Sequence, residues 1–296
     1  MFVRHTPAAP LDAFVACLWS SEREALPHAR ERNLPTGRAD LIFALRQDHL
    51  SRFADANDAV GLRFRGAVIQ GPQERALFRD TSEPSSVVGV HFHPGGASAL
   101  LGVPMTELAG RTLALDDLWG TRADAFRDQL RSLPDAPSRL RCLEVFLLTR
   151  LSRTVPANDD AAIAWALQRF HARGDAGSVE SVRAALGWSP RRFIAQFSMR
   201  VGLAPKRYCR LHRFQSVVHR LAQGRSDQGW AQLASEAGYA DQAHMIREFR
   251  TFSGLTPGRY RAIGSDQANH VAVTPEKIFN TRPARAATLG PPNARR

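Results

Sequence analysis

Two stretches near the C-terminal end carry arginine, glutamine and histidine side chains in a helical pattern. Residues 178–202 read SVESVRAALGWSPRRFIAQFSMRVG, and residues 230–254 read WAQLASEAGYADQAHMIREFRTFSG. Arginine and glutamine can pair with the edges of guanine and adenine, and arginine also contacts phosphates. These residue types therefore favour binding to a nucleic acid.

The same arrangement of elements is predicted to position these side chains in both stretches. Each pattern predicts a short helix, a turn at Gly187 or Gly238, and a longer helix. Glycine suits such a tight inter-helix turn because it adopts positive φ without strain. The apolar positions are Val182, Leu186, Phe193 and Phe197 in the first stretch and Leu233, Ala237, Met245 and Phe249 in the second. A short helix, a turn and a longer helix form a helix-turn-helix, whose second helix enters the major groove of DNA.

The distribution of charge agrees with this interpretation. Residues 1–158 hold 19 basic and 18 acidic side chains, whereas residues 159–264 hold 16 basic and 8 acidic ones. A basic excess confined to one part of a chain is typical of a protein that binds the phosphate backbone. The alternative, a merely solvated helix face, does not explain why the repeated pattern and the excess charge coincide.

The two longer helices are expected at residues 189–200 and 241–252. On the first, Ile194 and Ala195 make the outward face partly apolar, so this helix is expected to rely on Arg191 and Arg192, mostly at phosphates. On the second, Gln242 is expected at adenine and Arg247 at guanine. The full set of predicted DNA contacts is Arg191, Arg192, Lys206, Arg207, Gln242, His244, Arg247 and Arg250.

Residues 161–262 closely resemble the AraC/XylS family of bacterial transcription regulators. The resemblance is strongest in ASEAGYADQAHMIREFRTFSGLTPGRYR (234–261) and is supported by LGWSPRRFIAQF and GLAPKRY in the first copy. It implies a seven-helix module over residues 159–263, in which a long helix at 203–224 joins two helix-turn-helix units. Two recognition helices would then enter successive major grooves of promoter or operator DNA. An activator of this kind would also contact RNA polymerase.

Residues 1–155 predict a second, mostly β domain. Strands are expected within 34–45, 66–72 and 85–96, and their Gly and Pro punctuation indicates a small barrel or a sandwich. LPTGRADLIF, VVGVHFHPGGASALLGVPMTELAG and RTLALDDLWG resemble an uncharacterised domain often found ahead of AraC-type modules, which implies a small cupin-like β-barrel with trailing helices. The predicted fold class is therefore α+β, with an all-α double helix-turn-helix domain at the C-terminal end.

Four residues of this domain are candidates for contact with a small-molecule effector. They are Arg38 and Asp40 at a turn into a strand, and His91 and His93, whose alternation places them on one face of a strand. A structural ion pair or a turn-stabilising aspartate is an equally open interpretation of Arg38 and Asp40. No carboxylate follows His93 closely, so the sequence predicts neither a metal site nor a cofactor.

Two other classes of function stay open. In one, the first domain is a cupin-like metalloenzyme, against which the missing glutamate argues; no catalytic residues are predicted, and the chain is expected not to be an enzyme. In the other, a degraded first recognition helix leaves non-specific DNA binding, and the first domain recruits partners.

The remaining sequence features bear on compartment and assembly. The chain shows no signal peptide and no apolar run that could span a membrane, which together with three widely spaced cysteines predicts a cytoplasmic protein. Leucines at helical spacing in 138–152 could form a homodimer seam, but packing on their own domain is favoured. Residues 264–296 are expected to be a disordered basic tail.

Overall fold

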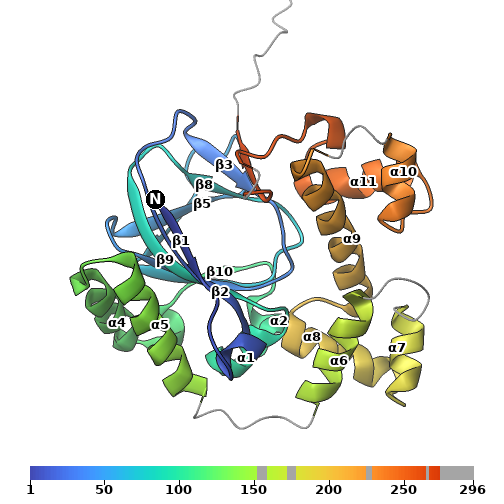
Figure 1. Ribbon diagram of the computed structural model, residues 1–296, viewed down its shortest axis with the longest axis horizontal. Helices are drawn as coiled ribbons and strands as arrows, with labels where there is room; N and C mark the ends of the chain where they lie inside the picture. Colours follow the sequence, from blue (N-terminus) through green and yellow to red (C-terminus); the bar gives the residue numbers. More distant parts are fainter. Residues whose placement is uncertain (152–158, 172–177, 225–228, 265–266, 274–296) are drawn as a thin grey trace, which may run out of the picture.

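The computed structural model describes residues 1–151, 159–171, 178–224, 229–264 and 267–273. Two antiparallel β-sheets with helices at one end form the N-terminal part, and helices form nearly all of the C-terminal part (Figure 1). The α+β class predicted from the sequence is therefore confirmed. The predicted boundary between the two parts falls largely on residues 152–158, outside the described residues.

The first sheet holds the most apolar strands of the chain. Strand β9 (Ser85–Phe92) carries the β-branched run Val87–Val88, which suits a pleated, buried surface. In spatial order the strands are β1 (Phe2–His5), β2 (Val15–Arg23), β9, β4 (Asp40–Ala44), β7 (Ala67–Gln70) and β10 (Thr112–Ala114). One face of this sheet packs against the helices of the N-terminal part in a continuous apolar core.

The second sheet is shorter and more polar. Its spatial order is β11 (His270–Ala272), β3 (Arg30–Asn33), β8 (Leu77–Asp80), β5 (His49–Phe53) and β6 (Leu62–Arg65). All pairings in both sheets are antiparallel. The described strands thus form two sheets and are not closed into one barrel. Of the two architectures left open by the strand pattern, the structure has the sandwich.

Five helices accompany the sheets: α1 (Gly96–Leu101), α2 (Met105–Leu108), α3 (Asp116–Trp119), α4 (Thr121–Ser132) and α5 (Ala136–Leu151). Leu140, Leu143 and Leu147 of α5 are buried in the same core as the first sheet. Packing of this helix on its own domain, the favoured interpretation of the leucine spacing, is confirmed.

The C-terminal part contains the predicted repeat. Its helices are α6 (Asp160–His171), α7 (Val179–Ala185), α8 (Pro190–Val201), α9 (Pro205–Ala222), α10 (Trp230–Glu236) and α11 (Gln242–Ser253), followed by a 3₁₀ turn at Pro257–Arg259. Their apolar faces share one core, in which Phe193, Phe197, Phe214 and Phe249 are completely enclosed.

Local signals explain where the two long repeat helices begin and end. Ser189 and Asp241 cap the N-termini of α8 and α11 by accepting hydrogen bonds from the backbone N–H three residues on. The turns before these helices contain Gly187 (φ 65°) and Gly238 (φ 79°). The predicted need for glycine at both turns is therefore confirmed.

The tail prediction is wrong for residues 267–273. These residues lie beside the second sheet, where β11 pairs with β3 through His270 opposite Asn33 and Ala272 opposite Glu31. Val271 is buried, with 6% of its surface exposed. The strand forms because an edge of the N-terminal sheet is available to it, which local composition does not reveal. Residues 274–296 lie outside the described part of the chain.

Further contacts join the two parts of the protein. Gln215 of α9 donates to the carbonyl of Pro35 at 2.6 Å, and Arg32 of β3 donates to the carbonyl of Ser253 at 2.9 Å. A Cβ on Gly37 would lie 2.9 Å from the side chain of Leu211. The helical part is therefore held against the N-terminal part by α8, which packs on α1 and α2, by the loop contacts of α9 and by strand β11 (Figure 1).

The structure also bears on membrane spans and on the three cysteines. Within the described ranges, no helix combines the length and apolar character that crossing a bilayer requires. Cys17, Cys142 and Cys209 are unpaired and at least partly buried. Burial raises the pKa of the Cys209 thiol to about 11, which keeps it protonated and poorly reactive at neutral pH.

Candidate nucleic-acid interface and effector cavity

Helix α8 presents a mixed surface at its N-terminal end. Arg191 is exposed, and so is Ile194, with 49% of its surface accessible. Arg192 is also exposed, but it forms an ion pair with Asp159 at 3.0 Å, and its guanidinium lies 4.4 Å from the ring centre of Trp188. Of the two arginines predicted on this helix, only Arg191 therefore lacks such a partner among the described residues.

Helix α11 presents a more polar surface. Gln242, Arg247 and Arg250 are exposed, so their side chains are accessible to a ligand outside the protein. His244 is half-buried: its Nε2 lies 3.5 Å from a carboxylate oxygen of Glu248, and its ring meets the edge of Tyr239. The structure thus leaves three of the four predicted residues of this helix accessible and directs the fourth toward the protein.

Glu248 is a residue that sequence reasoning missed. Its side chain is buried, it accepts a hydrogen bond from Arg210 at 2.5 Å, and its second oxygen lies 3.9 Å from Arg213. Both arginines belong to α9, so this carboxylate fixes α11 to the linking helix. The available signal was the position of Glu248 three residues after Met245 and four before Phe252, which places the acid on the inward, apolar side of the helix.

The start of α9 carries the last two predicted contacts. Lys206 and Arg207 are both exposed. Arg207 reaches the N-terminal part, where it forms an ion pair with Glu74 at 3.0 Å. The structure therefore places Arg207 at the junction between the two parts of the protein.

A cavity of about 1120 Å³ lies between the two sheets. One wall comes from the first sheet and includes Trp19, Ile42 and His91, and the opposite wall comes from the second sheet and includes Leu50 and Arg79. The C-terminal segment 267–270 and His219 of α9 complete the lining. A space of this size between apolar and polar walls is suited to a small molecule.

Three of the four predicted effector residues line this cavity. His91 Nδ1 lies 2.6 Å from Asp40 Oδ1, and Arg38 Nε lies 3.7 Å from the same oxygen. Burial alone would raise the pKa of Asp40, but His91 and Arg38 outweigh it and hold that pKa below its ordinary value. The carboxylate therefore stays charged inside the cavity.

His93, the fourth predicted effector residue, does not line the cavity. Strand β9 ends at Phe92, so the alternation predicted from the sequence does not extend to His93, which lies outside the cavity lining. Burial, followed by the charge of Arg38, lowers its pKa. Among the residues that the structure describes, no group of three histidine, cysteine, aspartate or glutamate side chains is arranged to hold a metal ion.

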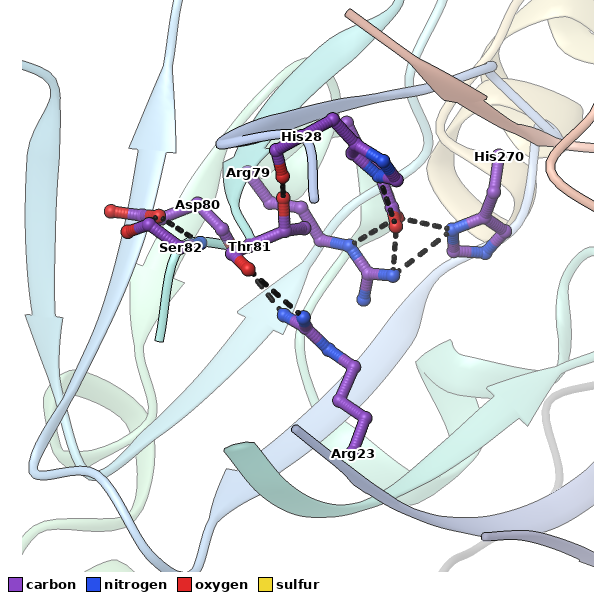
Figure 2. Close-up of polar contacts among 8 residues, drawn as sticks. Arg23, His28, Arg79, Asp80, Thr81, Ser82 and His270 are labelled. Atoms are coloured by element: carbon purple, nitrogen blue, oxygen red, sulfur yellow. Dashed lines mark hydrogen bonds and ion pairs between the residues drawn. The ribbon is translucent and has the colours of Figure 1, made fainter. Parts of the chain in front are cut away.

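An ion cluster around a buried carboxylate forms part of the cavity lining, and Figure 2 shows its polar contacts. Glu31 is fully buried and accepts hydrogen bonds from Arg79 Nε at 2.9 Å and Nη2 at 2.5 Å. His270 Nδ1 and His28 Nε2 each lie 3.2 Å from a Glu31 oxygen. Burial would raise the pKa of Glu31, but His270 and Arg79 outweigh it and keep the carboxyl ionised. No sequence signal connects Glu31 with His270, because they are 239 residues apart.

Comparison with known families identifies both parts. Residues 3–114 match a family described as a domain of unknown function, DUF6597, and residues 183–263 match a helix-turn-helix domain. An uncharacterized HTH-type transcriptional regulator of Haemophilus influenzae is 31% identical over 83 residues. That match covers 28% of this chain and 27% of the relative, so it spans about a quarter of each protein.

The solved structures to which the chain is similar include ToxT from Vibrio cholerae and the AraC-like transcriptional activator CuxR. ToxT is 9% identical with a TM-score of 0.43, and the match covers 82% of this chain and 97% of ToxT. CuxR is 13% identical with a TM-score of 0.27, and the match covers 76% and 87% of the two chains. The N-terminal part of the chain is thus similar to the DUF6597 family, and the part that holds the repeated helices is similar to a helix-turn-helix domain.

Proposed function

We propose that the protein is a sequence-specific DNA-binding transcription regulator. In this proposal α8 and α11 enter successive major grooves, and α9 sets their spacing. The observation that carries it is the exposed surface of α11, where Gln242 and Arg247 project from a helix that is capped at Asp241 and packed on α9. The basic excess of residues 159–264 supplies the attraction to the phosphate backbone.

The surroundings of each side chain support different roles along this surface. Gln242 and Arg247 are exposed and would read adenine and guanine edges, and the exposed Arg191, Lys206 and Arg250 would contact phosphates. Arg192 and His244 have protein partners, so a DNA contact by either requires that partner to be given up. Arg207 faces the same competition from Glu74.

The cavity of the N-terminal domain supports regulation by a small molecule. It lies between two sheets, and residues 267–270, beyond the helix-turn-helix domain, form part of its lining. A ligand that binds one arrangement of this segment more tightly would shift the equilibrium between arrangements of α8 and α11. The size of the shift is set by the difference in its affinity for the two arrangements. Homodimer formation, contact with RNA polymerase and a cytoplasmic location stay predictions that accompany this role.

Selection of bound DNA from a random library tests the proposal. Purified protein is expected to enrich one motif at near-physiological salt, and Arg247→Ala is expected to relax it at one position, because a bidentate arginine contributes about 1–3 kcal/mol of discrimination. Arg63→Ala, which removes an exposed arginine of β6 remote from α11, is the matched control.

Three outcomes separate the open hypotheses. A relaxed motif in Arg247→Ala but not in Arg63→Ala supports the proposed regulator. Binding that falls steeply with salt and enriches no motif, with or without small molecules, indicates a protein that binds DNA without sequence preference. The exposed, apolar Ile194 on α8 favours this alternative. Absence of DNA binding at low salt refutes the proposal.

A further inference from the structure

The cavity contains a buried arginine that forms no ion pair with any residue that the structure describes. Arg52 lies on β5, where it shares the inward face of the strand with Leu50, and only 8% of its surface is exposed. Its Nη1 donates to the carbonyl of the adjacent Ser51 at 3.0 Å, and its Nε has no hydrogen-bond partner within the described part of the chain. A buried guanidinium with an unused donor is unfavourable unless another group satisfies it.

The register of the second sheet places a second cation beside it. Arg52 is directly opposite Arg79 on β8, and Arg79 is directly opposite Glu31 on β3. Glu31 accepts two hydrogen bonds from Arg79, so this row of three side chains carries one uncompensated positive charge. Neighbouring like charges repel, and a negatively charged group between them would remove the repulsion.

Of the carboxylates that line the cavity, which are Glu22, Glu31, Asp40, Asp80 and Glu83, Asp40 is the one whose charge acts on Arg52, and it is already engaged. Asp40 on the opposite wall is held by His91 at 2.6 Å and lies near Arg38. Burial, and then the charge of Arg79, lowers the pKa of Arg52 to about 10, while Asp40 raises it only in part. Arg23 also lines the cavity, where it donates hydrogen bonds to the carbonyls of Asp80 and Thr81 and is stabilised in part by the charges of Glu31 and Asp80.

The remaining lining is suited to the body of such a ligand. Trp19, Ile42, Leu50, Leu77 and Val87 provide apolar surface around the charged row. An arginine fork matches the oxygens of a carboxylate or phosphate, and the match is strengthened where water is excluded. The walls therefore combine a site for an oxyanion with a site for hydrocarbon or an aromatic ring.

We infer that the cavity binds a small molecule bearing a carboxylate or phosphate, which Arg52 holds beside Arg79. The apolar part of this molecule lies against Trp19 and Leu50. This inference deepens the proposed effector role and rests on it for biological meaning, but binding can be measured without DNA. A failed DNA selection and a failed binding measurement are therefore separate results.

A pair of fluorescent probes tests the inference on the full chain. 8-Anilinonaphthalene-1-sulfonate carries an anionic group, and N-phenyl-1-naphthylamine has the same ring system without it. The wild-type protein is expected to bind the anionic probe at least about tenfold more tightly than the neutral one, as one charge-assisted hydrogen bond predicts. Arg52→Gln is expected to remove this difference and leave the affinity for the neutral probe unchanged.

Matched variants control for folding and for general charge. Arg63→Gln removes an exposed arginine from the neighbouring strand β6 and is expected to keep the wild-type preference. If Arg52→Gln does not fold, as judged by circular dichroism, Arg52→Lys keeps the charge without the fork and is expected to bind the anionic probe with intermediate affinity.

Displacement of the bound anionic probe distinguishes the two oxyanions. Hexanoate is expected to displace it from a site for carboxylates, and phenyl phosphate from a site for phosphates. Displacement by either one supports the inference. Displacement by neither, equal affinity of the wild type for both probes, or an unchanged preference in a folded Arg52 variant overturns it.

Discussion

Replacement of Glu31 by glutamine is the most informative perturbation of the buried cluster. Glu31→Gln preserves the shape of the side chain but removes its charge, and it leaves Arg79 without its carboxylate. The change also weakens the link to His270 of β11, which connects the segment after the helix-turn-helix domain to the sandwich. Both the stability of the sandwich and the attachment of its last strand are therefore affected.

The expected loss follows from burial. Glu31 has no exposed surface, and breaking a buried ion pair by removing one partner costs about 3–5 kcal/mol. Arg79 is not fully enclosed, because 24% of its side chain remains exposed, so we expect a value near the lower end, about 3 kcal/mol. For a domain of this size that corresponds to a fall in Tm of roughly 6–12 °C.

Urea and thermal unfolding of the full chain at pH 7 measure this loss. The matched control is Glu22→Gln, which breaks the ion pair of Glu22 with Arg139 at 2.7 Å. Because 46% of the Glu22 side chain is exposed, the control is expected to cost less than about 1 kcal/mol. The double variant Glu31→Gln/Arg79→Gln is expected to be more stable than the sum of the single changes predicts.

The pH dependence of the free energy of unfolding provides an independent test of whether the charge of Glu31 stabilises the fold. The pKa of Glu31 is held below its unfolded value of 4.5, so its stabilisation is complete above that pH and is lost as pH falls further. The difference between the wild type and Glu31→Gln should therefore persist from pH 7 to pH 5 and decrease under stronger acid. A loss equal to that of Glu22→Gln, or a difference that disappears above pH 5, would refute the reasoning.

Four further outcomes are expected. Arg52→Met should raise the stability of the ligand-free protein by about 2 kcal/mol in urea, since it removes an uncompensated buried charge; a less stable variant contradicts this. Burial, and then the charge of His171, lowers the pKa of His212 to about 4 in the folded protein. Below about pH 6.5 the unfolded chain therefore binds a proton that the folded protein does not, and the free energy of unfolding of the wild type should fall by roughly 1 kcal/mol by pH 5. His212→Gln should flatten that pH profile, and an unchanged profile would exclude His212 as its source. Val271→Asp should release β11 and accelerate tryptic cleavage after Arg261 by about tenfold, and an unchanged rate would show that the strand does not protect this segment. Arg191→Ala should reduce the slope of log affinity for DNA against log salt by about 1, as one lost phosphate contact predicts, and an identical slope would remove Arg191 from the interface.

The helical domain was largely predictable because its signals are local. Caps at Ser189 and Asp241 and positive-φ glycines at 187 and 238 lie within a few residues of the helices that they delimit. The predicted recognition helices at 189–200 and 241–252 consequently differ from α8 and α11 by one residue at each end. The accessibility of individual side chains was less predictable, because Arg207 and His244 have partners that only the tertiary fold brings close.

The cavity depends on pairings between distant strands, and this limits what the sequence can reveal. Asp40 and His91 were predicted as site residues from their positions beside turns and strands, and the structure pairs them. Arg52 and Glu31 were not predicted, since their inward orientation and their common partner Arg79 follow from strand register. His93 shows the opposite error, in which a local alternation was extended one residue beyond the end of the strand.

The position of β11 in the chain has a consequence for biosynthesis. The ribosome completes β3 long before β11. Glu31 of β3 and His270 of β11, for example, are 239 residues apart in the sequence. While the helix-turn-helix domain is being made, β3 is therefore the open edge of the second sheet on a nascent chain. Its sequence, Arg-Glu-Arg-Asn, is highly charged, and charged side chains discourage an open edge from pairing with other chains. Those charges protect the nascent protein from aggregation until its own last strand arrives.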